Sequence, residues 1–296
     1  MWRLARLTTQ EGTEIDELIA LALANVADQA AAGLATAPKI TGAQLQEIRG
    51  DLADPRNAMT FEVDMEKYLS LDSVMMCIRG EGTKVLDPAA IINPGETVDE
   101  GDLAKADWDV LLRALNGAAA AYGDIEKLPT YAERQAAYAK REPAFEEAKA
   151  PLSMVAEGSS RPEVGKAAVE AFLKMGPEES REAYSRRLAM LFGPDPAVGA
   201  RVDKLVEREH VYRRLAELAV DMATYRLGHR EYPETLAALA SPIDASDPFS
   251  GKALIYRRTS DGFLLYSVGF NGKDDGGSDD ILNEKDDIVI RAGKRE

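Results

Sequence analysis

The sequence has few of the residues that most often carry catalysis or covalent cross-links. Among its 296 residues there is one cysteine, Cys77, and there are two histidines, His210 and His229. A single cysteine excludes a disulfide within the chain. Because Cys77 lies in the apolar segment SVMMCIRG, we expect a buried, unreactive thiol. The motifs His-Glu-x-x-His and Gly-x-Ser-x-Gly are absent, so no signature of a zinc protease or a serine hydrolase is found.

Positive charge is also scarce. Lysine and arginine number 36 against 51 aspartates and glutamates, which gives a formal net charge of −15. Phosphate contacts need clustered lysine and arginine, and an anionic bilayer attracts basic segments. We therefore expect neither nucleic acid nor an anionic membrane surface as a partner. The balance fits a soluble protein or one that binds cations.

Long apolar runs are missing as well. No stretch approaches the roughly 18 uninterrupted apolar residues of a membrane span. The first segment, MWRLARLTTQEGTEIDE, has no apolar signal-peptide core. The sequence therefore predicts no direct membrane insertion of the chain as given. The chain begins as if in the middle of a helix, without a capping residue, which leaves room for a missing N-terminal anchor or signal.

Apolar periodicity predicts helices over about the first 230 residues. Apolar residues make up 45% of the chain and aromatic residues only 6%, and alanine is abundant. Thr41 is a candidate N-cap for a short helix that ends near Asp54. Residues 80–102 are rich in Pro and Gly and predict a long loop, and residues 157–162 predict a linker. A further helix is predicted over residues 11–33, with these residues facing inward: Ile15, Leu18, Ile19, Ala22 and Val26.

The longest predicted helix covers residues 198–227 and ends before Gly228. Its apolar residues step by four, three, four and three, at Val211, Leu215, Leu218, Met222 and Tyr225. After it come two strand-like segments, KALIYRR and GFLLYSV, joined by the hairpin signal Asp261-Gly262. The sequence thus predicts a mainly α protein. A helical domain of unknown function, 1–197, precedes a long helix and a small antiparallel β-sheet, 198–296.

An acidic, glycine-rich stretch, GFNGKDDGGSDDILNEKDDI, lies between two strand-like segments. Hard cations such as Ca²⁺ take six to eight oxygen ligands from a bending chain. An EF-hand is excluded, because Lys273 occupies its third position and strands flank the stretch. A solvated acidic loop without an ion is the alternative. The side-chain oxygens available to an ion belong to Asn271, Asp274, Asp275, Asp279, Asp280, Asp286 and Asp287.

Four short motifs occur in order around this stretch: Tyr232-Pro233, DPFSGKALIY, LYSVGFNGKDDGG and DDI. The series resembles the C-terminal part of the major pseudopilin of type II secretion systems, over about 65 residues. That family carries Tyr-Pro, Asp-Pro-Trp-Gly-x-Pro-Tyr, Leu-Tyr-Ser-x-Gly-x-Asp-Gly and Asp-Asp-Ile. The resemblance implies a long helix packed on a small antiparallel sheet, with a Ca²⁺-binding loop near the C-terminus.

The resemblance also implies a ligand set. It places the backbone carbonyl of Val268, the side chains of Asn271 and Asp287, with Asp286 beside them, and the carbonyl of Val289 around the ion. Asn271 replaces the aspartate of the family, so one negative charge is missing. We expect Asp274, Asp275 or Asp279 to compensate for it. The prepilin signal and its apolar helix are absent, and about 200 helical residues precede the module. The whole arrangement looks like a group of uncharacterised planctomycete proteins with this tail.

Two other motifs partly match known functional sites. Glu207-x-x-His210 matches half of a carboxylate di-iron site, but a second Glu-x-x-His pair is missing. GSSRPEVGKA, residues 158–167, departs from a phosphate-binding loop in its spacing and in Ala167, and predicts ordinary helix. Neither motif directs the chain to an enzymatic function.

We therefore expect a non-enzymatic, extracytoplasmic bacterial protein of the periplasm or cell envelope. Its cofactor would be a structural Ca²⁺ ion, and its role would be interaction or assembly with a protein partner that the sequence does not identify. One alternative is a helical scaffold that binds a protein or peptide in a groove, with no role for a metal. A second alternative is a metal-assisted hydrolase that uses carboxylates.

Overall fold

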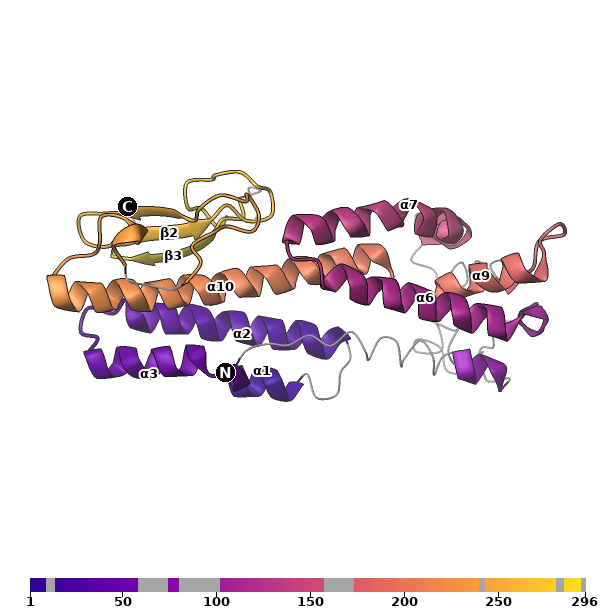
Figure 1. Cartoon of the computed structure of the whole chain (residues 1–296), viewed down its shortest axis with the longest axis horizontal. Helices are drawn as coiled ribbons and strands as arrows, with labels where there is room; N and C mark the ends of the chain where they lie inside the picture. Colours follow the sequence, from indigo (N-terminus) through magenta and orange to yellow (C-terminus); the bar gives the residue numbers. More distant parts are fainter. Residues whose placement is uncertain are drawn as a thin grey trace. The chain divides into compact units, whose positions relative to one another are not determined.

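The computed structural model describes residues 1–8, 14–57, 74–79, 102–156, 173–239, 243–280 and 285–293 (Figure 1). The chain forms two compact units. Unit 1 comprises Met1–Phe61, Thr130–Ala132 and Arg201–Glu296, and unit 2 comprises Glu62–Pro129 and Glu133–Ala200. Both ends of the chain therefore contribute to unit 1, and the predicted division at residues 197 and 198 stays a prediction.

Unit 1 is built from helices and one small sheet. Its longest element is helix α10 (Pro196–His229), which belongs to this unit from Arg201 onward. In Figure 1 the sheet lies on one side of α10, and α2 runs along the other side with α1 and α3 beyond it. A mainly helical fold with a long helix followed by a small antiparallel sheet is thus confirmed. The remaining helical elements are α1 (Trp2–Thr8), α2 (Glu14–Ala35), α3 (Gly42–Ala53), and the 3₁₀ turns η1 (Pro55–Asn57) and η3 (Leu236–Ala238).

The sheet has three antiparallel strands in the order β1-β2-β3: Ile255–Arg258, Phe263–Ser267 and Ile288–Ala292. The turn between β1 and β2 closes with a hydrogen bond of 3.0 Å from the backbone N–H of Thr259 to the carbonyl of Gly262. The predicted hairpin at Asp261-Gly262 is therefore confirmed. Strands β2 and β3 pair with Leu265 opposite Ile290 and Ser267 opposite Ile288, so the acidic stretch connects two neighbouring strands.

The core of unit 1 lies between α10, α2, α3 and the sheet. Four of the five residues of the predicted apolar seam of α10 are buried: Val211, Leu215 and Met222 are fully enclosed and Leu218 is 2% exposed, while Tyr225 is half-buried. On the sheet the alternating residues of β2 and β3 face this core, and they include Phe263, Leu265, Ile288 and Ile290. Each large apolar side chain buried in this way contributes roughly 1.5–3 kcal/mol, so the seam fixes the sheet on the helix.

Helix α2 buries a different face from the one predicted. Leu18, Ile19 and Val26, expected to point inward, are 38%, 46% and 52% exposed. Ala22, also expected to point inward, is exposed as well. The prediction of the buried face was wrong because it followed the larger apolar residues, whereas most of the residues that pack inward are alanines. Alanine lets helix backbones approach closely, and Asp28 on the same face has a partner on α10. The buried residues of α2 are Ala20, Leu21, Ala24, Ala27, Asp28, Ala31, Ala32 and Ala35.

Within the described part of the chain, one helix is long and apolar enough to cross a membrane by length and composition. It is α2, whose window Leu18–Ala35 has a mean hydropathy of 1.5. The window is not an uninterrupted apolar run, since it contains Asp28. Of the window, 44% is buried inside the structure. Asp28 itself is fully enclosed. The core helix of a globular protein satisfies the same criteria.

Helix α3 begins and ends as its sequence predicts. Thr41 is the N-cap, and its hydroxyl accepts from the backbone N–H of Gln44 at 3.3 Å, while the Gln44 side chain accepts from the Thr41 N–H at 3.0 Å. This reciprocal capping box satisfies two N–H groups that the first turn leaves without partners. The helix stops before Asp54, next to Pro55.

Unit 2 packs helices α6 (Trp108–Glu126) and α9 (Arg181–Phe192) around a second apolar core, and most of α7 (Tyr131–Ala156) also belongs to this unit. Cys77 lies in that core at 5% exposure, which confirms the predicted burial of its side chain. The core also contains Val74, Leu103, Leu111, Leu115, Leu173, Tyr184 and Leu188.

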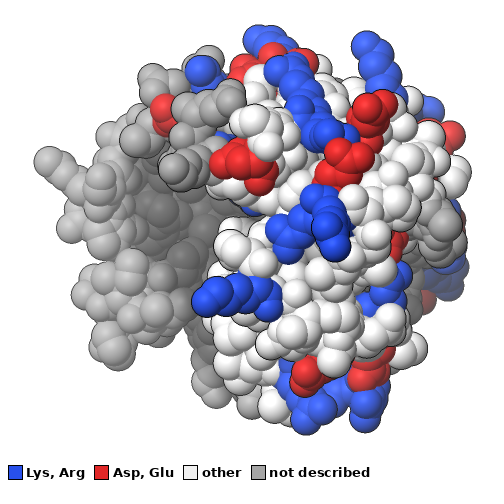
Figure 2. Space-filling view, turned by 90° about the vertical axis from the view of Figure 1, so that its left-hand side faces the viewer, with Lys and Arg blue, Asp and Glu red and all other residues white. Residues whose placement is uncertain are grey.

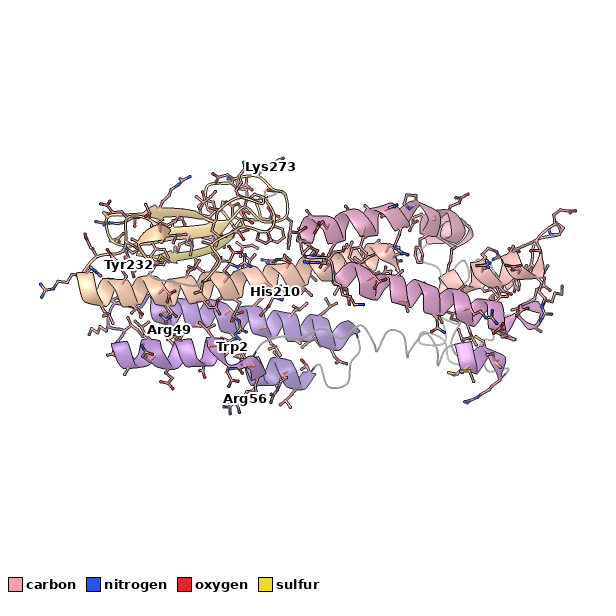
Figure 3. All side chains as sticks on the ribbon, viewed as in Figure 1. Trp2, Arg49, Arg56, His210, Tyr232 and Lys273 are labelled. Atoms are coloured by element: carbon pink, nitrogen blue, oxygen red, sulfur yellow. The ribbon has the colours of Figure 1, made fainter. Side chains whose placement is uncertain are left out.

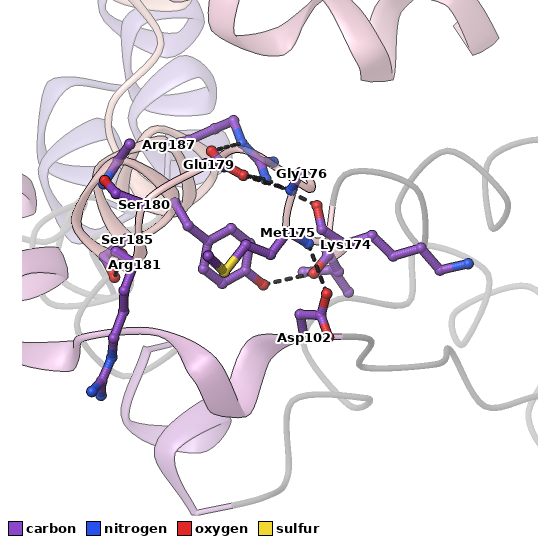
Figure 4. Close-up of polar contacts among 12 residues, drawn as sticks. Asp102, Lys174, Met175, Gly176, Glu179, Ser180, Arg181, Ser185 and Arg187 are labelled. Atoms are coloured by element: carbon purple, nitrogen blue, oxygen red, sulfur yellow. Dashed lines mark hydrogen bonds and ion pairs between the residues drawn. The ribbon is translucent and has the colours of Figure 1, made fainter.

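The segment that leads into α9 is held by charged side chains (Figure 4). Asp102 accepts a hydrogen bond of 2.9 Å from the backbone N–H of Met175. Glu179 accepts from the N–H of Gly176 at 3.0 Å and pairs with Arg187 through two contacts of 2.9 Å. The hydrogen bonds from Arg187 lower the pKa of the Glu179 carboxyl. The cluster therefore fixes the approach to α9 at neutral pH.

Several predicted segments lie outside the described residues. They are the long loop at 80–102, apart from Asp102, the linker at 157–162 and the phosphate-loop-like motif at 158–167. For these segments the sequence predictions stay predictions.

Candidate functional site

The acidic loop is held at both ends by strands. Val268 follows the last residue of β2 and is 6% exposed, and Val289 is paired with Tyr266 inside the sheet. The anchor beneath the loop is Asp247, which is 1% exposed. Its two carboxylate oxygens accept from the hydroxyl of Ser267 at 2.9 Å and from the backbone N–H of Val268 at 3.0 Å. The beginning of the loop therefore has a fixed position on the sheet.

Asp286 closes the far side of the loop onto its beginning. Its Oδ2 accepts from the backbone N–H groups of Phe270 at 2.8 Å and Asn271 at 3.1 Å. Gly269 sits against the backbone of Asp286 with φ +64°, and a Cβ at this position would lie 2.1 Å from the Asp286 carbonyl oxygen. The second carboxylate oxygen, Asp286 Oδ1, is buried and has no hydrogen-bond partner among the described residues.

Asp287 organises the glycine-rich middle of the loop. It is 2% exposed, and its Oδ2 accepts from the N–H of Gly277 at 2.7 Å and of Ser278 at 3.3 Å. Its Oδ1 lies 3.5 Å from the backbone nitrogen of Asp275. Burial raises the pKa of the Asp287 carboxyl, and the N–H groups of Gly277, Asp275 and Ser278 oppose that rise.

Asp274 turns back to the sheet. It accepts from the phenol of Tyr266 at 2.8 Å and from the N–H of Gly276 at 2.9 Å. The hydrogen bond from Tyr266 lowers the pKa of Asp274, and burial together with this carboxylate raises the pKa of Tyr266 to about 12. Asp274 is therefore ionised at neutral pH and ties the loop to strand β2.

Asn271 stands where the pseudopilin pattern has an aspartate. Its amide donates to Asp275 Oδ2 at 2.9 Å, and its Oδ1 accepts from the backbone N–H of Lys273 at 2.6 Å. The structure therefore brings Asn271 together with Asp275 and Asp286, while Asp279 is exposed on the surface. The carboxylate of Asp275 thus places a negative charge next to Asn271, the position where the family has an aspartate.

The residues present meet part of what a calcium ion requires. Within the described ranges, no three His, Cys, Asp or Glu side chains are grouped to hold a metal ion. Carboxylate oxygens of Asp274, Asp286 and Asp287 accept backbone N–H groups instead. One buried anionic oxygen, Asp286 Oδ1, lacks a donor. A buried oxygen of this kind fits a hard cation, so the donor set is compatible with Ca²⁺.

A second cluster, which the sequence analysis missed, lies between α1, α2 and α10. Asp28 of α2 is fully enclosed and Glu209 of α10 is 2% exposed. Asp28 Oδ1 accepts from the indole of Trp2 at 2.9 Å and lies 3.1 Å from Arg213 Nε. Arg213 also approaches Glu209 at 3.7 Å. Trp2 is labelled on α1, beneath α2, in Figure 3.

Both carboxyls of this cluster have raised pKa values. Burial raises the pKa of Asp28, against the opposing effect of Arg213. Burial and then the charge of Asp28 raise the pKa of Glu209 to about 8. The sequence carries a signal for the cluster: Asp28 is a lone charge in the alanine-rich segment ALANVADQAAAG, and Glu209 and Arg213 are spaced i, i+4. An isolated charge on an apolar helix face needs a partner.

The half di-iron motif gains no support from its own residues. Glu207 is 7% exposed, whereas His210 is exposed to solvent. The other histidine, His229, contacts the carbonyl of Tyr225 at 3.0 Å through Nδ1.

Comparisons of the chain with family models, with curated proteins and with solved structures find no match. The resemblance of the C-terminal residues to the major pseudopilin therefore rests on the four motifs alone.

Proposed function

We propose that the chain is a non-enzymatic, extracytoplasmic bacterial protein whose C-terminal module binds a structural Ca²⁺ ion in the acidic loop. The ion stabilises the loop on the small sheet, and the module acts in interaction or assembly with a protein partner. The observation that carries the proposal is the buried, donor-free oxygen Asp286 Oδ1 in a loop that both neighbouring strands hold in place.

Asp286 would hold the ion together with Asn271, Asp287 and the backbone carbonyl of Val268. Bound calcium supplies positive charge that offsets the repulsion among the loop carboxylates. Asp274 and Asp275 lie at the edge of this group and add negative charge around it. Extracellular calcium modules bind at about 10⁻⁴–10⁻³ M, and for a role outside the cytoplasm we expect an affinity in this range.

Thermal unfolding of the whole chain tests the proposal. It is followed in EDTA and in CaCl₂, with MgCl₂ at the same ionic strength as the reference. Calcium at a hundredfold excess over its dissociation constant adds about 2.7 kcal/mol. For a unit of this size we expect an increase in unfolding temperature of about 5–10 °C. Magnesium, which demands a more rigid octahedral site, should give a smaller shift.

Two variants locate the effect. Asp286→Asn removes the charge of the proposed ligand at constant shape, and we expect it to abolish the calcium-dependent shift. Asp280→Asn removes the same charge from an exposed position of the same loop, outside the proposed ligand set, and should keep the shift. Equal calcium responses of wild type and Asp286→Asn, or no response of the wild type, would contradict the proposal.

A further inference from the structure

The cluster between α1, α2 and α10 contains two acids and one base. Arg213 supplies one positive charge, and Asp28 and Glu209 supply two carboxyl groups, all within 3.7 Å of the guanidinium. If both carboxyls were ionised, one uncompensated negative charge would be buried. A buried charge without a partner is costly, and such a group takes up a proton instead. With one proton on the pair, the three groups together are neutral.

One oxygen atom of each carboxyl group lacks a hydrogen-bond donor, and a shared proton would supply it. Asp28 Oδ2 and Glu209 Oε1 are both buried and both lack a hydrogen-bond donor. Each carboxyl is more than nine-tenths buried, so bulk water does not satisfy these atoms. Two acceptors from neighbouring carboxyls are satisfied together when one of them carries a proton and donates it to the other.

The neighbouring groups described below do not donate a hydrogen bond to these two oxygen atoms. The two terminal nitrogens of the Arg213 guanidinium donate to other groups, the backbone carbonyls of Leu52 at 3.1 Å and Asn57 at 2.8 Å. From α1 the facing group is the indole of Trp2, which already donates to Asp28 Oδ1. Among the described residues, α3 and η1 thus contribute backbone carbonyls and α1 an indole. From α10 comes the cation Arg213, whose charge also acts on the half-buried Glu217, a carboxyl whose pKa burial raises.

We propose that Asp28 and Glu209 share a single proton, and that this proton keeps helix α2 packed against helix α10. The contact between the two helices in the core of unit 1 therefore depends on pH. When the proton leaves, two adjacent carboxylates face one guanidinium inside the protein, and their repulsion loosens the contact between the two helices. The Asp28–Glu209 pair is independent of the calcium loop, with which it shares no residue.

The direction of the pH dependence follows from where the proton is held. An unfolded glutamate loses its proton near its ordinary pKa of 4.5, whereas in the folded chain burial and Asp28 raise the pKa of Glu209 to about 8. Between these values the folded chain binds one more proton than the unfolded chain. The folding equilibrium constant therefore falls up to about tenfold for each pH unit of increase, and levels off above the folded pKa.

The experiment uses the fluorescence of Trp2, which donates a hydrogen bond to Asp28, to follow unfolding. Trp108→Phe leaves Trp2 as the one tryptophan of the chain. Urea unfolding followed by Trp2 emission is measured from pH 5.5 to 8.5 in this background, alone and with Glu209→Gln. Glutamine keeps the shape of a protonated glutamate, donates a hydrogen bond and does not titrate. The matched control is Glu234→Gln, which removes the same charge at an exposed position.

We expect the parent and Glu234→Gln to lose about 100-fold in folding equilibrium constant between pH 5.5 and 7.5 through this proton. Glu209→Gln should remove that loss and be the more stable protein at pH 8.5. An unchanged pH slope in Glu209→Gln would overturn the proposal. Failure of Glu209→Gln to fold at pH 6 would overturn it as well, because the proposal holds that a neutral side chain of this shape is the native form.

Discussion

At the scale of single residues, Asp247 joins two segments of the C-terminal module through four hydrogen bonds. It is almost fully enclosed, and both of its oxygens accept hydrogen bonds: Oδ1 from Ser267 and Phe249, Oδ2 from Val268 and Ser250. An amide in its place would turn an N–H group toward one of these donors. The carboxylate therefore joins the turn after Asp247 to the end of strand β2.

We predict that Asp247→Asn lowers the free energy of unfolding by about 2–3 kcal/mol, because a buried charge-assisted hydrogen bond is lost and a donor is left unpaired. Asp244→Asn, in the same segment but exposed, is the matched control and should cost less than about 1 kcal/mol. Urea unfolding measures both values. Similar costs for the two variants would show that Asp247 does not hold the loop.

Substitutions at Gly269 and Gly272 distinguish the cost of a strained backbone conformation from the cost of a steric clash. Both have positive φ, +64° and +67°, but a Cβ on Gly269 would meet the Asp286 backbone at 2.1 Å, whereas a Cβ on Gly272 meets nothing within 4 Å. We predict a loss of about 1–2 kcal/mol for Gly272→Ala and about 2–5 kcal/mol for Gly269→Ala. Chemical unfolding measures the two losses. Equal losses would mean that the loop does not close onto Asp286.

Sequence reasoning succeeded at residues whose role is local and failed where the partner is distant. Thr41 caps its own helix through Gln44, three residues away, and that pattern is readable in the sequence. The sequence analysis missed Asp28, whose partners Trp2 and Arg213 come from other helices, although a lone charge among alanines was the available signal. Their proximity is a property of the packed structure, which a single sequence does not display.

At the scale of elements, the period of a helix was easier to predict than its orientation. The seam of α10 was identified because its large apolar residues occupy one face, and that face is buried. In α2 the large residues Leu18, Ile19 and Val26 lie on the exposed face, and alanines pack inward. Residue size misleads where two helices approach closely.

A second pair of glycines tests packing along α10. A Cβ on Gly199 would lie 2.7 Å from Tyr122 Cε1 and 2.8 Å from Tyr138 Cε1, two buried rings in edge-to-face contact, whereas a Cβ on Gly228 meets nothing within 4 Å. Alanine is favoured over glycine in a helix by about 1 kcal/mol. We predict that Gly228→Ala stabilises by up to about 1 kcal/mol and that Gly199→Ala destabilises by about 1–2 kcal/mol.

Far-UV circular dichroism during urea unfolding measures both glycine variants. Stabilisation of both by the same amount would contradict the close contact of Gly199 with the tyrosine rings.

At the scale of the whole molecule, the net charge of −15 opposes folding through self-repulsion. The face seen in Figure 2 shows lysine and arginine interspersed with aspartate and glutamate, so the negative excess does not gather on that face. Negative charge does gather in the acidic loop, where Asn271 contacts both Asp275 and Asp286 and the backbone nitrogen of Asp275 lies 3.5 Å from Asp287. A general salt effect and a specific calcium effect are therefore both expected.

We predict that raising KCl from about 0.01 M to about 0.15 M increases the unfolding temperature by about 2–4 °C, because the screening length falls from about 30 Å to about 8 Å. Wild type and Asp286→Asn should respond equally to KCl, since screening acts on all charges. A KCl response confined to the wild type would mean that the loop binds monovalent cations rather than calcium.

The sequence predicted the class of fold and the position of the acidic loop between strands, because both follow from periodicity and turn residues. It did not predict how the loop is held. Its carboxylates accept backbone N–H groups, and which N–H faces which carboxylate depends on the left-handed turns at Gly269, Gly276 and Gly277. The Ca²⁺ ligand set stays a prediction.

A crystal of the whole chain grown in CaCl₂ tests the central claim most directly. We predict an anomalous difference peak next to Asp286 Oδ1, with oxygen ligands from Val268, Asn271 and Asp287 at about 2.3–2.6 Å. A loop that keeps the hydrogen bonds of Asp286 and Asp287 described above, with no peak between Asn271 and Asp287 in saturating calcium, would contradict the account.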